Sequence, residues 1–240
     1  PKAMTPKQRV HAALRREPVD RVPIAMWFHP GTRALLADRL EIPPAYVDDV
    51  MGSDVHMTWV NNNYAMEGIV HEQDGQSHVD FWGIEWTKQG PYNQVTRFPL
   101  VDASPDEVRG YQFPVEHKEF LLARMDPLVA TAAEYFIGCD VSPCVFEMYW
   151  RLRGLERTLL EMASEPQLTD EMFGRCADFA VDLSEEACRR FPLDWLWSGD
   201  DVASQLSMMM SPETWRALIK PHQKRVFDVG KAHGLWVAHQ

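Results

Sequence analysis

Two adjacent carboxylates, Asp200 and Asp201, are the side chains of this sequence with the clearest potential for chemistry. They follow residues 193–198, an apolar run that is too short for a stable helix and that ends at Ser198-Gly199. A buried parallel strand delivers acids to the rim of a sheet in this way. We therefore predict that both aspartates are catalytic and that Gln205 binds substrate beside them. In the alternative, Asp200 caps the following turn and only Asp201 faces the pocket, and a structural capping role stays open for each aspartate.

Glu147 is a further acidic candidate, because it follows the strand-like residues 135–141 and lies at the start of a predicted helix over residues 145–154. A carboxylate at the end of a parallel strand can hold or transfer a proton, so we predict that Glu147 is catalytic. Tyr149, in the first turns of the same helix, is predicted to shape the substrate pocket. A carboxylate near a helix N-terminus is also favourable without any function, and this alternative stays open.

His239 ends the apolar residues 235–239, and we expect a histidine at this point of a strand to face the mouth of the fold. It is a weak indication of metal by itself, since zinc takes three or four ligands. Four more residues complete the predicted substrate pocket, namely Trp27, His29, Asn61 and Trp82. His29 precedes Pro30-Gly31, so its alternative is a solvated loop position.

The elements that must position these side chains are predicted from helix-capping residues, from glycine and proline at element ends, and from the spacing of apolar residues. The predicted helices cover residues 5–16, 32–40, 44–51, 118–134, 145–154, 166–190 and 211–233, with a short one beginning at Ser104. The predicted parallel strands lie near residues 22, 54, 135, 193 and 235. Residues 64–98 are predicted to form an antiparallel insertion, because two strand-like segments, Ile69-Val70-His71 and Val79-Asp80-Phe81-Trp82, flank Asp74-Gly75.

Alternating strands and helices predict an α/β fold with a parallel sheet, and the length favours a TIM-type (β/α)8 barrel over a doubly wound sheet. Neither GxGxxG nor GxxxxGK[ST] occurs in the sequence. Since closure requires eight strands and only five are predicted, we expect an incomplete barrel that is truncated at its C-terminal end. Residues 1–240 would form one domain, whose N-terminal part, about 1–117, carries helices and the β insertion.

The composition excludes some classes of partner. The 35 acidic residues exceed the 24 basic ones, giving a net charge of −11, so nucleic acid is an improbable partner and strongly anionic substrates are disfavoured. No apolar run approaches the roughly 18 residues of a membrane span, so we expect a soluble, cytoplasmic protein without a membrane partner. The 4 cysteines form no CxxC pair and are expected to be reduced and mostly buried.

An ordered set of short motifs covers nearly the whole chain. The motifs are Met4-Thr5-Pro6-Lys7-Gln8-Arg9-Val10, Asp20-Arg21-Val22-Pro23, Asp80-Phe81-Trp82-Gly83-Ile84, Phe146-Glu147, Leu152-Arg153-Gly154, Gly199-Asp200-Asp201 with Gln205, Ser211-Pro212-Glu213, Lys220-Pro221 and Lys231-Ala232-His233-Gly234. Each motif alone is loose, but in this order the set resembles the uroporphyrinogen decarboxylase-like superfamily and, within it, the cobalamin-dependent methyltransferases, including methylcobamide:coenzyme M methyltransferases and O-demethylase components.

The resemblance implies a TIM barrel with an N-terminal helical elaboration. It also implies transfer of a methyl group between a small methylated donor or methylcobamide and a corrinoid or thiol acceptor. Cobalamin would be free or carried by a partner corrinoid protein, and a homodimer is compatible with the family. In the methyltransferase branch a His-x-Cys and a later cysteine bind zinc, which activates the thiol. His239 matches the histidine and Gln240 the middle position, so the remaining ligands would lie beyond residue 240.

Two rival functions remain. A uroporphyrinogen decarboxylase-type enzyme would hold the carboxylates of a tetrapyrrole with an arginine-rich segment after the first strand. Here the corresponding residues 26–33 are apolar until Arg33, which counts against that substrate. The second rival is a non-catalytic homologue that binds a corrinoid protein without turnover.

Overall fold

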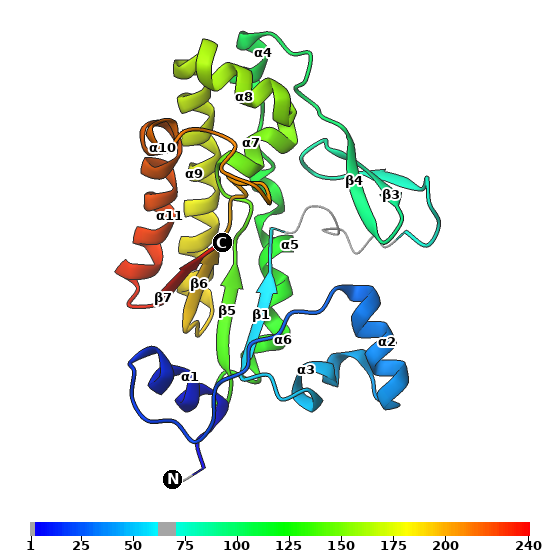
Figure 1. The fold of residues 1–240 in the computed structure, drawn as a ribbon, viewed down its shortest axis with the longest axis vertical. Helices are drawn as coiled ribbons and strands as arrows, with labels where there is room; N and C mark the ends of the chain where they lie inside the picture. The colour runs from blue at the N-terminus through cyan, green and yellow to red at the C-terminus, as the bar shows by residue number, and fades with distance from the viewer. Residues whose placement is uncertain (1–2, 62–70) are drawn as a thin grey trace.

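A four-stranded parallel sheet forms the centre of the protein (Figure 1). The computed structural model describes residues 3–61 and 71–240. The strands are β1 (Val55–Trp59), β5 (Phe136–Asp140), β6 (Trp195–Ser198) and β7 (Trp236–His239), side by side in that order. A separate antiparallel sheet contains β2 (Ser77–Val79), β3 (Glu85–Gln89) and β4 (Tyr92–Arg97).

The helices lie before and between these strands. They are α1 (Pro6–Leu14), α2 (Pro30–Leu40), α3 (Val47–Val50), α4 (Pro105–Gly110), α5 (Lys118–Leu122), α6 (Asp126–Val129), α7 (Phe146–Arg153), α8 (Leu155–Ser164), α9 (Pro166–Arg190), α10 (Pro212–Thr214) and α11 (Lys220–Ala232). Short 3-10 turns cover Pro44–Tyr46, Val115–His117 and Ala123–Met125, and a π-helical turn covers Trp215–Ile219.

β5 is the most buried strand of the parallel sheet, with all of its residues buried. A Cβ on Gly138 would lie 1.7 Å from Nε1 of Trp195, so only glycine allows the indole to cross this point of the strand. Helices α9 and α11 pack against each other on one side of β6 and β7 (Figure 1). A Cβ on Gly230 of α11 would lie 2.7 Å from Val237, which shows how closely this helix approaches the sheet.

Helix α1 lies at the amino ends of the strands (Figure 1), where His11 contacts the ring of Phe136 edge-on at 5.1 Å. Its predicted start is confirmed. The side chain of Thr5 accepts a hydrogen bond from the backbone N–H of Gln8, and the Gln8 side chain accepts one from the Thr5 backbone N–H. This capping box satisfies N–H groups that have no partner within the helix. α1 thereby closes one end of the sheet and leaves the carboxyl ends of the strands for a site.

The strand predicted near residue 22 is wrong. Residues 22–29 run as an extended segment without a strand assignment, linked to the start of β1 by a bond from the Asp54 N–H to the Ile24 carbonyl (2.6 Å). The carboxylate of Asp54 accepts the Ile24 N–H at 2.7 Å, where a ladder would use a carbonyl. Pro23 has no N–H to donate, so the segment does not continue as a strand. The predicted helix over residues 118–134 is also interrupted, forming α5 and α6 separated by a 3-10 turn.

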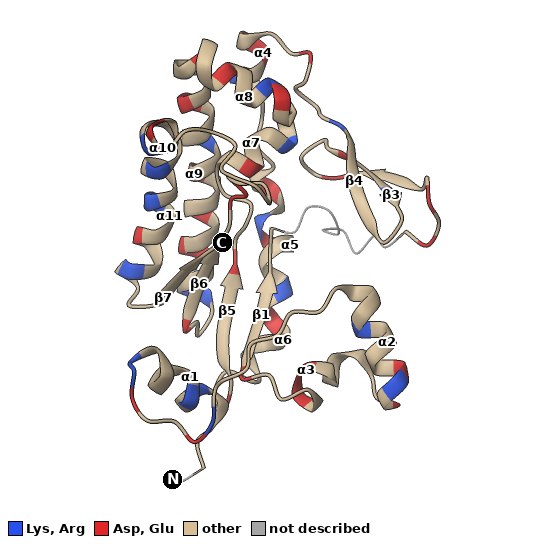
Figure 2. Ribbon diagram, viewed as in Figure 1, with Lys and Arg blue, Asp and Glu red and all other residues tan. Residues whose placement is uncertain are grey.

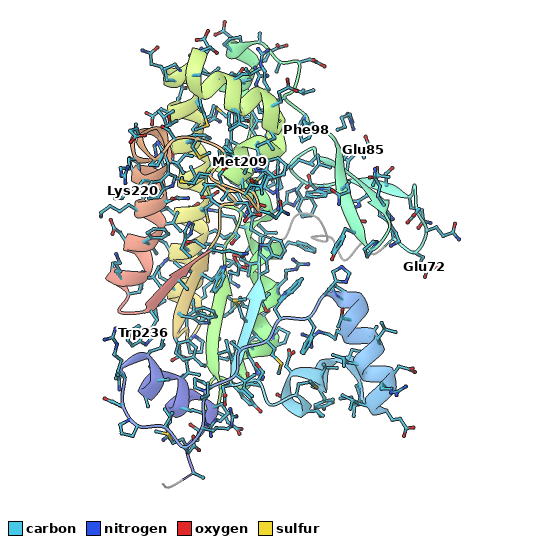
Figure 3. All side chains as sticks on the ribbon, viewed as in Figure 1. Glu72, Glu85, Phe98, Met209, Lys220 and Trp236 are labelled. Carbon is cyan, nitrogen blue, oxygen red and sulfur yellow. The ribbon has the colours of Figure 1, made fainter. Side chains whose placement is uncertain are left out.

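The parallel strands therefore number four rather than five, and the described residues form no closed barrel. The open sheet is compatible with the incomplete barrel that was predicted. The antiparallel insertion is confirmed over β2 to β4, but its strands differ from the predicted ones. His71 lies outside any strand, and β2 ends at Val79, after which residues 80–84 turn into β3; Ile69 and Val70 lie outside the described residues. The insertion projects from the main body, with Glu72 and Glu85 on the side away from Lys220 of α11 (Figure 3).

No helix in the described ranges is long and apolar enough to cross a membrane.

Candidate functional site

A cavity of about 740 Å³ lies at the carboxyl ends of the parallel strands. Its walls come from all four strands or the loops after them, from α7 and from the segment that precedes α2. The lining residues are Trp27, Met57, Trp59, Asp140, Ser142, Glu147, Arg151, Trp197, Gly199, Asp201, His239 and Gln240. Figure 2 shows acidic residues around these strand ends and on α7. The cavity gathers four of the residues predicted from sequence: Trp27, Glu147, Asp201 and His239.

Strand register explains which side chains share the cavity wall. Trp59 of β1 pairs with Asp140 of β5, which pairs in turn with Trp197 of β6, so the three side chains share one face of the sheet. Met57 lies two residues before Trp59 and shares that face. The indole Nε1 of Trp59 donates a hydrogen bond to the carbonyl of Ser142 at 2.5 Å, which fixes the ring against the loop after β5. The wall is therefore apolar and aromatic, with one carboxylate set into it.

Asp140 is the buried acid of this wall, with 8 % of its surface exposed. Its Oδ1 accepts hydrogen bonds from the backbone N–H of Ser142 at 2.8 Å and from the Ser142 hydroxyl at 2.5 Å. Burial raises the pKa of Asp140 to about 7; the Ser142 hydrogen bonds oppose this and the charge of Glu147 adds to it. Asp140 can therefore hold or release a proton near neutral pH.

Glu147 lines the cavity from the first turn of α7 and is paired with a cation. Its Oε1 accepts a short hydrogen bond from Arg151, one turn further along the helix. The Arg151 guanidinium also lies 5.4 Å from the ring centroid of Trp86 in β3, within the range of a cation–π contact. The pair links α7 to the insertion and brings no net charge to the cavity.

The two adjacent aspartates have different surroundings. Asp201 is exposed, lines the cavity, and makes no hydrogen bond or ion pair with any residue that the structure describes. Asp200 is 1 % exposed and does not line the cavity. Its Oδ1 accepts from the backbone N–H groups of Val145 (2.9 Å) and Glu147 (3.0 Å) at the start of α7.

The remaining oxygen of Asp200 accepts from Nε2 of Gln223 in α11 at 3.1 Å. Burial raises the pKa of Asp200 to about 7, against the opposing effect of these three hydrogen bonds. The carboxylate thus joins the end of β6 to α7 and α11, and it positions Glu147 by holding that residue's backbone. Asp200 therefore has the structural capping role that was the alternative for it. The element that it caps is the N-terminus of α7.

His239 borders the cavity, and strand register places it beside Ser198, with its Nδ1 3.0 Å from the Ser198 hydroxyl. Its ring contacts Phe227 of α11 edge-on, with centroids 5.0 Å apart. Ala238, the preceding residue, pairs with Trp197 and so shares the face of that tryptophan. Desolvation lowers the pKa of His239, favouring the neutral imidazole.

The side chains around His239 do not supply a zinc site. Within residues 3–61 and 71–240, no group of three or more His, Cys, Asp or Glu side chains is arranged to hold a metal ion. Zinc sites in proteins use three or four such ligands. Cys139 and Cys144 are buried, burial raises the pKa of both thiols, and neither lines the cavity. No chemical step is therefore assigned to zinc.

Besides Asp200, five predicted residues lie outside the cavity lining. Trp82 is buried between the rings of Phe113 and Phe179, and the Tyr149 hydroxyl donates to Glu161 at 3.2 Å. His29 caps α2, with its Nδ1 accepting from the Gly31 N–H at 3.2 Å. Asn61 is 1 % exposed and donates to the Pro143 carbonyl at 3.3 Å, while Gln205 is exposed in the loop after β6.

The cavity also includes residues that were not predicted individually. Asp140, Trp59 and Trp197 share one sheet face, and Arg151 reaches the cavity from α7. The signal for Asp140 was present, since an acid at the end of an apolar strand is the same pattern that singled out Asp201. The tryptophans carried no comparable signal because aromatic residues in strands are common in cores.

Comparisons with known proteins bear on the fold. No protein family and no curated protein matches the sequence. Among solved structures, a methyltransferase from Methanosarcina mazei is similar with a TM-score of 0.62 and 18% sequence identity. The similarity covers 98% of this chain and 69% of that one. At this identity the comparison shows a shared fold.

Proposed function

We propose that this protein is a corrinoid-dependent methyltransferase that moves a methyl group between a small methylated donor or methylcobamide and a corrinoid or thiol acceptor. The observation that carries the proposal is the cavity, where three tryptophans and three carboxylates meet at the carboxyl ends of parallel strands. Active sites of barrel enzymes lie at this end of the strands. The fold shared with a methyltransferase along 98% of the chain supports the reaction class.

The chain's own residues have distinct tasks in this proposal. Trp59, Trp197 and Met57 give an apolar wall that excludes water and can lie against a flat macrocycle or a methylated group. Glu147, held by Arg151, and Asp201 position the substrate. Asp140 takes or gives a proton as the charge of the bound molecule requires. When bound, a reduced corrinoid supplies the nucleophile that accepts the methyl group.

The cavity disfavours the tetrapyrrole decarboxylase. Several substrate carboxylates would need cationic partners, whereas the described lining contains one Lys or Arg side chain, Arg151, already paired with Glu147. The zinc role of His239, the corrinoid protein as a partner and a homodimer stay predictions.

Visible spectroscopy of the corrinoid tests the proposal. The protein is incubated with methylcobalamin and a thiol, and in a second reaction with reduced cobalamin and methylated donors. We expect protein-dependent conversion between the methylated and unmethylated corrinoid spectra in one of the two directions. Binding of cobalamin without conversion in either would favour the non-catalytic homologue, and release of carbon dioxide from a tetrapyrrole would favour the decarboxylase.

A further inference from the structure

The charges in the cavity do not balance. Three acidic side chains, one arginine and one histidine line its described walls, and desolvation lowers the pKa of that histidine, His239, which favours its neutral form. Glu147 and Arg151 neutralise each other as a pair, and Asp201 has no partner among the residues that the structure describes. Asp140 adds negative charge above neutral pH, because burial raises its pKa only to about 7. A bound molecule therefore meets a net negative charge that nothing in the described lining neutralises.

Aromatic rings provide the rest of the wall. Trp27, Trp59 and Trp197 line the cavity, and tryptophan has the ring face that attracts a cation most strongly. Trp59 is fixed by its hydrogen bond to Ser142. Trp197 is fixed by an edge-on contact with Trp195, with centroids 5.3 Å apart and ring planes at 86°. Rings held in place lose little freedom on binding, which favours affinity.

The combination selects one chemical class of ligand. A small hydrated cation is poorly matched to apolar walls, and an uncharged methyl ether leaves Asp201 without a counter-charge. A cation whose charged nitrogen or sulfur is surrounded by methyl groups matches both the apolar aromatic wall and the negative charge of the cavity. We propose that the cavity binds a methylated onium group, a quaternary ammonium or a sulfonium, as the methyl donor, between the tryptophans and beside Asp201. This inference rests on the proposed methyltransferase function.

The chemistry of such a donor is balanced within the proposed function. A bound corrinoid would supply the nucleophile that takes the methyl carbon, and the bond from that carbon to nitrogen or sulfur would break as the methyl group is transferred. The bonding electron pair stays on the heteroatom, so the donor leaves as a neutral amine or thioether and needs no proton. Loss of the positive charge also removes its attraction to the tryptophans and Asp201, which favours release of the product.

Choline and its uncharged isostere 3,3-dimethylbutan-1-ol test the inference, because they differ in charge while their shape is conserved. Binding is measured by isothermal titration calorimetry and by tryptophan fluorescence. We expect choline to bind about tenfold or more tightly than the isostere. Choline affinity should rise between pH 6 and pH 8, as Asp140 loses its proton. Equal affinities for the two molecules would overturn the inference.

Two variants with the same change of charge show where the cation binds. Asp201→Asn should weaken choline binding about two- to fivefold, as expected for the loss of an exposed counter-charge, with no effect on the isostere. Asp106→Asn is the control, since its side chain is 98 % exposed on α4 and outside the cavity lining, and it should leave both affinities unchanged. An unchanged choline affinity in Asp201→Asn would contradict the assigned site. Circular dichroism checks that both variants are folded.

The outcomes separate this inference from the function on which it rests. Choline binding with the expected selectivity but without any corrinoid conversion would leave the cation site standing and remove the methyltransferase. Conversion with an uncharged methyl ether or methanol, but with none of choline, tetramethylammonium or dimethylsulfoniopropionate, would keep the methyltransferase and overturn the onium donor.

Discussion

Asp200 and Asp201 are adjacent in sequence and do different work. Asp200 accepts three hydrogen bonds that join β6, α7 and α11, whereas Asp201 is exposed at the cavity. We expect Asp200→Ala to lower the free energy of unfolding by about 2–5 kcal/mol, because it leaves buried donors without an acceptor. Asp201→Ala should change it by about 0.5 kcal/mol or less. Chemical denaturation of both variants measures the difference, and equal losses would contradict the division of roles.

Asp140 gives a prediction about pH. Its pKa is about 7 in the folded protein and has its ordinary value near 4 in the unfolded chain, so the folded state binds more protons between these values. Stability contributed by protonated Asp140 is therefore complete below about pH 4 and is lost as pH rises towards 7. Asp140→Asn should reduce the fall in unfolding free energy over this range, by up to about 1.4 kcal/mol per pH unit.

Denaturation at several pH values provides the measurement for Asp140→Asn. The unfolding free energy of the variant should still fall as pH rises, since burial also raises the pKa of Asp200 to about 7. Superimposable pH dependences for the wild type and Asp140→Asn would show that Asp140 titrates at its ordinary value. The variant should also lose the increase in choline affinity between pH 6 and pH 8.

At the scale of elements, the loops after β5 and β6 approach each other closely at the cavity. A Cβ on Gly199, just after β6, would lie 2.8 Å from the Ser142 hydroxyl that donates to Asp140. We expect Gly199→Ala to displace Ser142, raise the pKa of Asp140 further and reduce kcat/KM by about tenfold or more. Gly110→Ala is the control, because its Cβ would meet nothing within 4 Å. The pH–rate profile of both variants is the measurement, and identical profiles would contradict this role of Gly199.

The segment that carries Trp27 depends on a buried ion-pair network. Asp54 is fully buried and accepts from Arg21 at 2.7 and 2.9 Å, from Arg9 at 2.5 Å, and from the Ile24 N–H. Asp54→Asn should cost about 2–4 kcal/mol of unfolding free energy, since it takes one of two counter-charges from the buried guanidinium of Arg9 and leaves donors at a fully buried position with a weaker acceptor.

Asp48→Asn is the matched control for the Asp54 network. Asp48 pairs with Arg33 at 3.0 Å, both side chains are about a quarter exposed, and its loss should cost about 1 kcal/mol or less. A comparable loss in the two variants, measured by thermal and chemical denaturation, would contradict the role assigned to Asp54.

Sequence patterns predicted some elements of the fold correctly and failed for the residues around Pro23. Cap residues predicted the starts of α1 and α4, and the periodicity of residues 166–190 predicted α9, because these signals act within one turn of helix. The apolar residues near Pro23 were predicted to be a strand, yet their partner is the carboxylate of Asp54, thirty positions along the chain. Such a contact depends on tertiary structure and has no local signal.

Some of the residues predicted for the site line the cavity, and others do not. The rule that acids and aromatics at strand ends meet at one edge placed Glu147, Asp201 and His239 in the cavity, whereas Trp27 reaches it from a segment that was wrongly predicted to be a strand. The rule could not separate Asp200 from Asp201, because the direction of a side chain after the last strand residue depends on the path of the loop. Trp82 and Tyr149 have the right residue type for a pocket, but they pack in the core instead.

At the scale of the whole molecule, the cavity lies on an open four-stranded sheet whose edges are β1 and β7. The chain spans 69% of the length of the methyltransferase whose fold it shares. The acidic surroundings of the strand ends, together with the net charge of −11, favour a cationic substrate over an anionic one (Figure 2).

The most direct test is the rate of corrinoid conversion in Glu147→Gln and Asp201→Asn, measured by visible spectroscopy beside the wild type and Asp106→Asn. Both cavity variants should lower kcat/KM by about tenfold or more, because the lost carboxylates position the substrate, while Asp106→Asn keeps the wild-type value. If kcat/KM in both cavity variants stayed within about threefold of the wild type, the cavity would not be the site of methyl transfer.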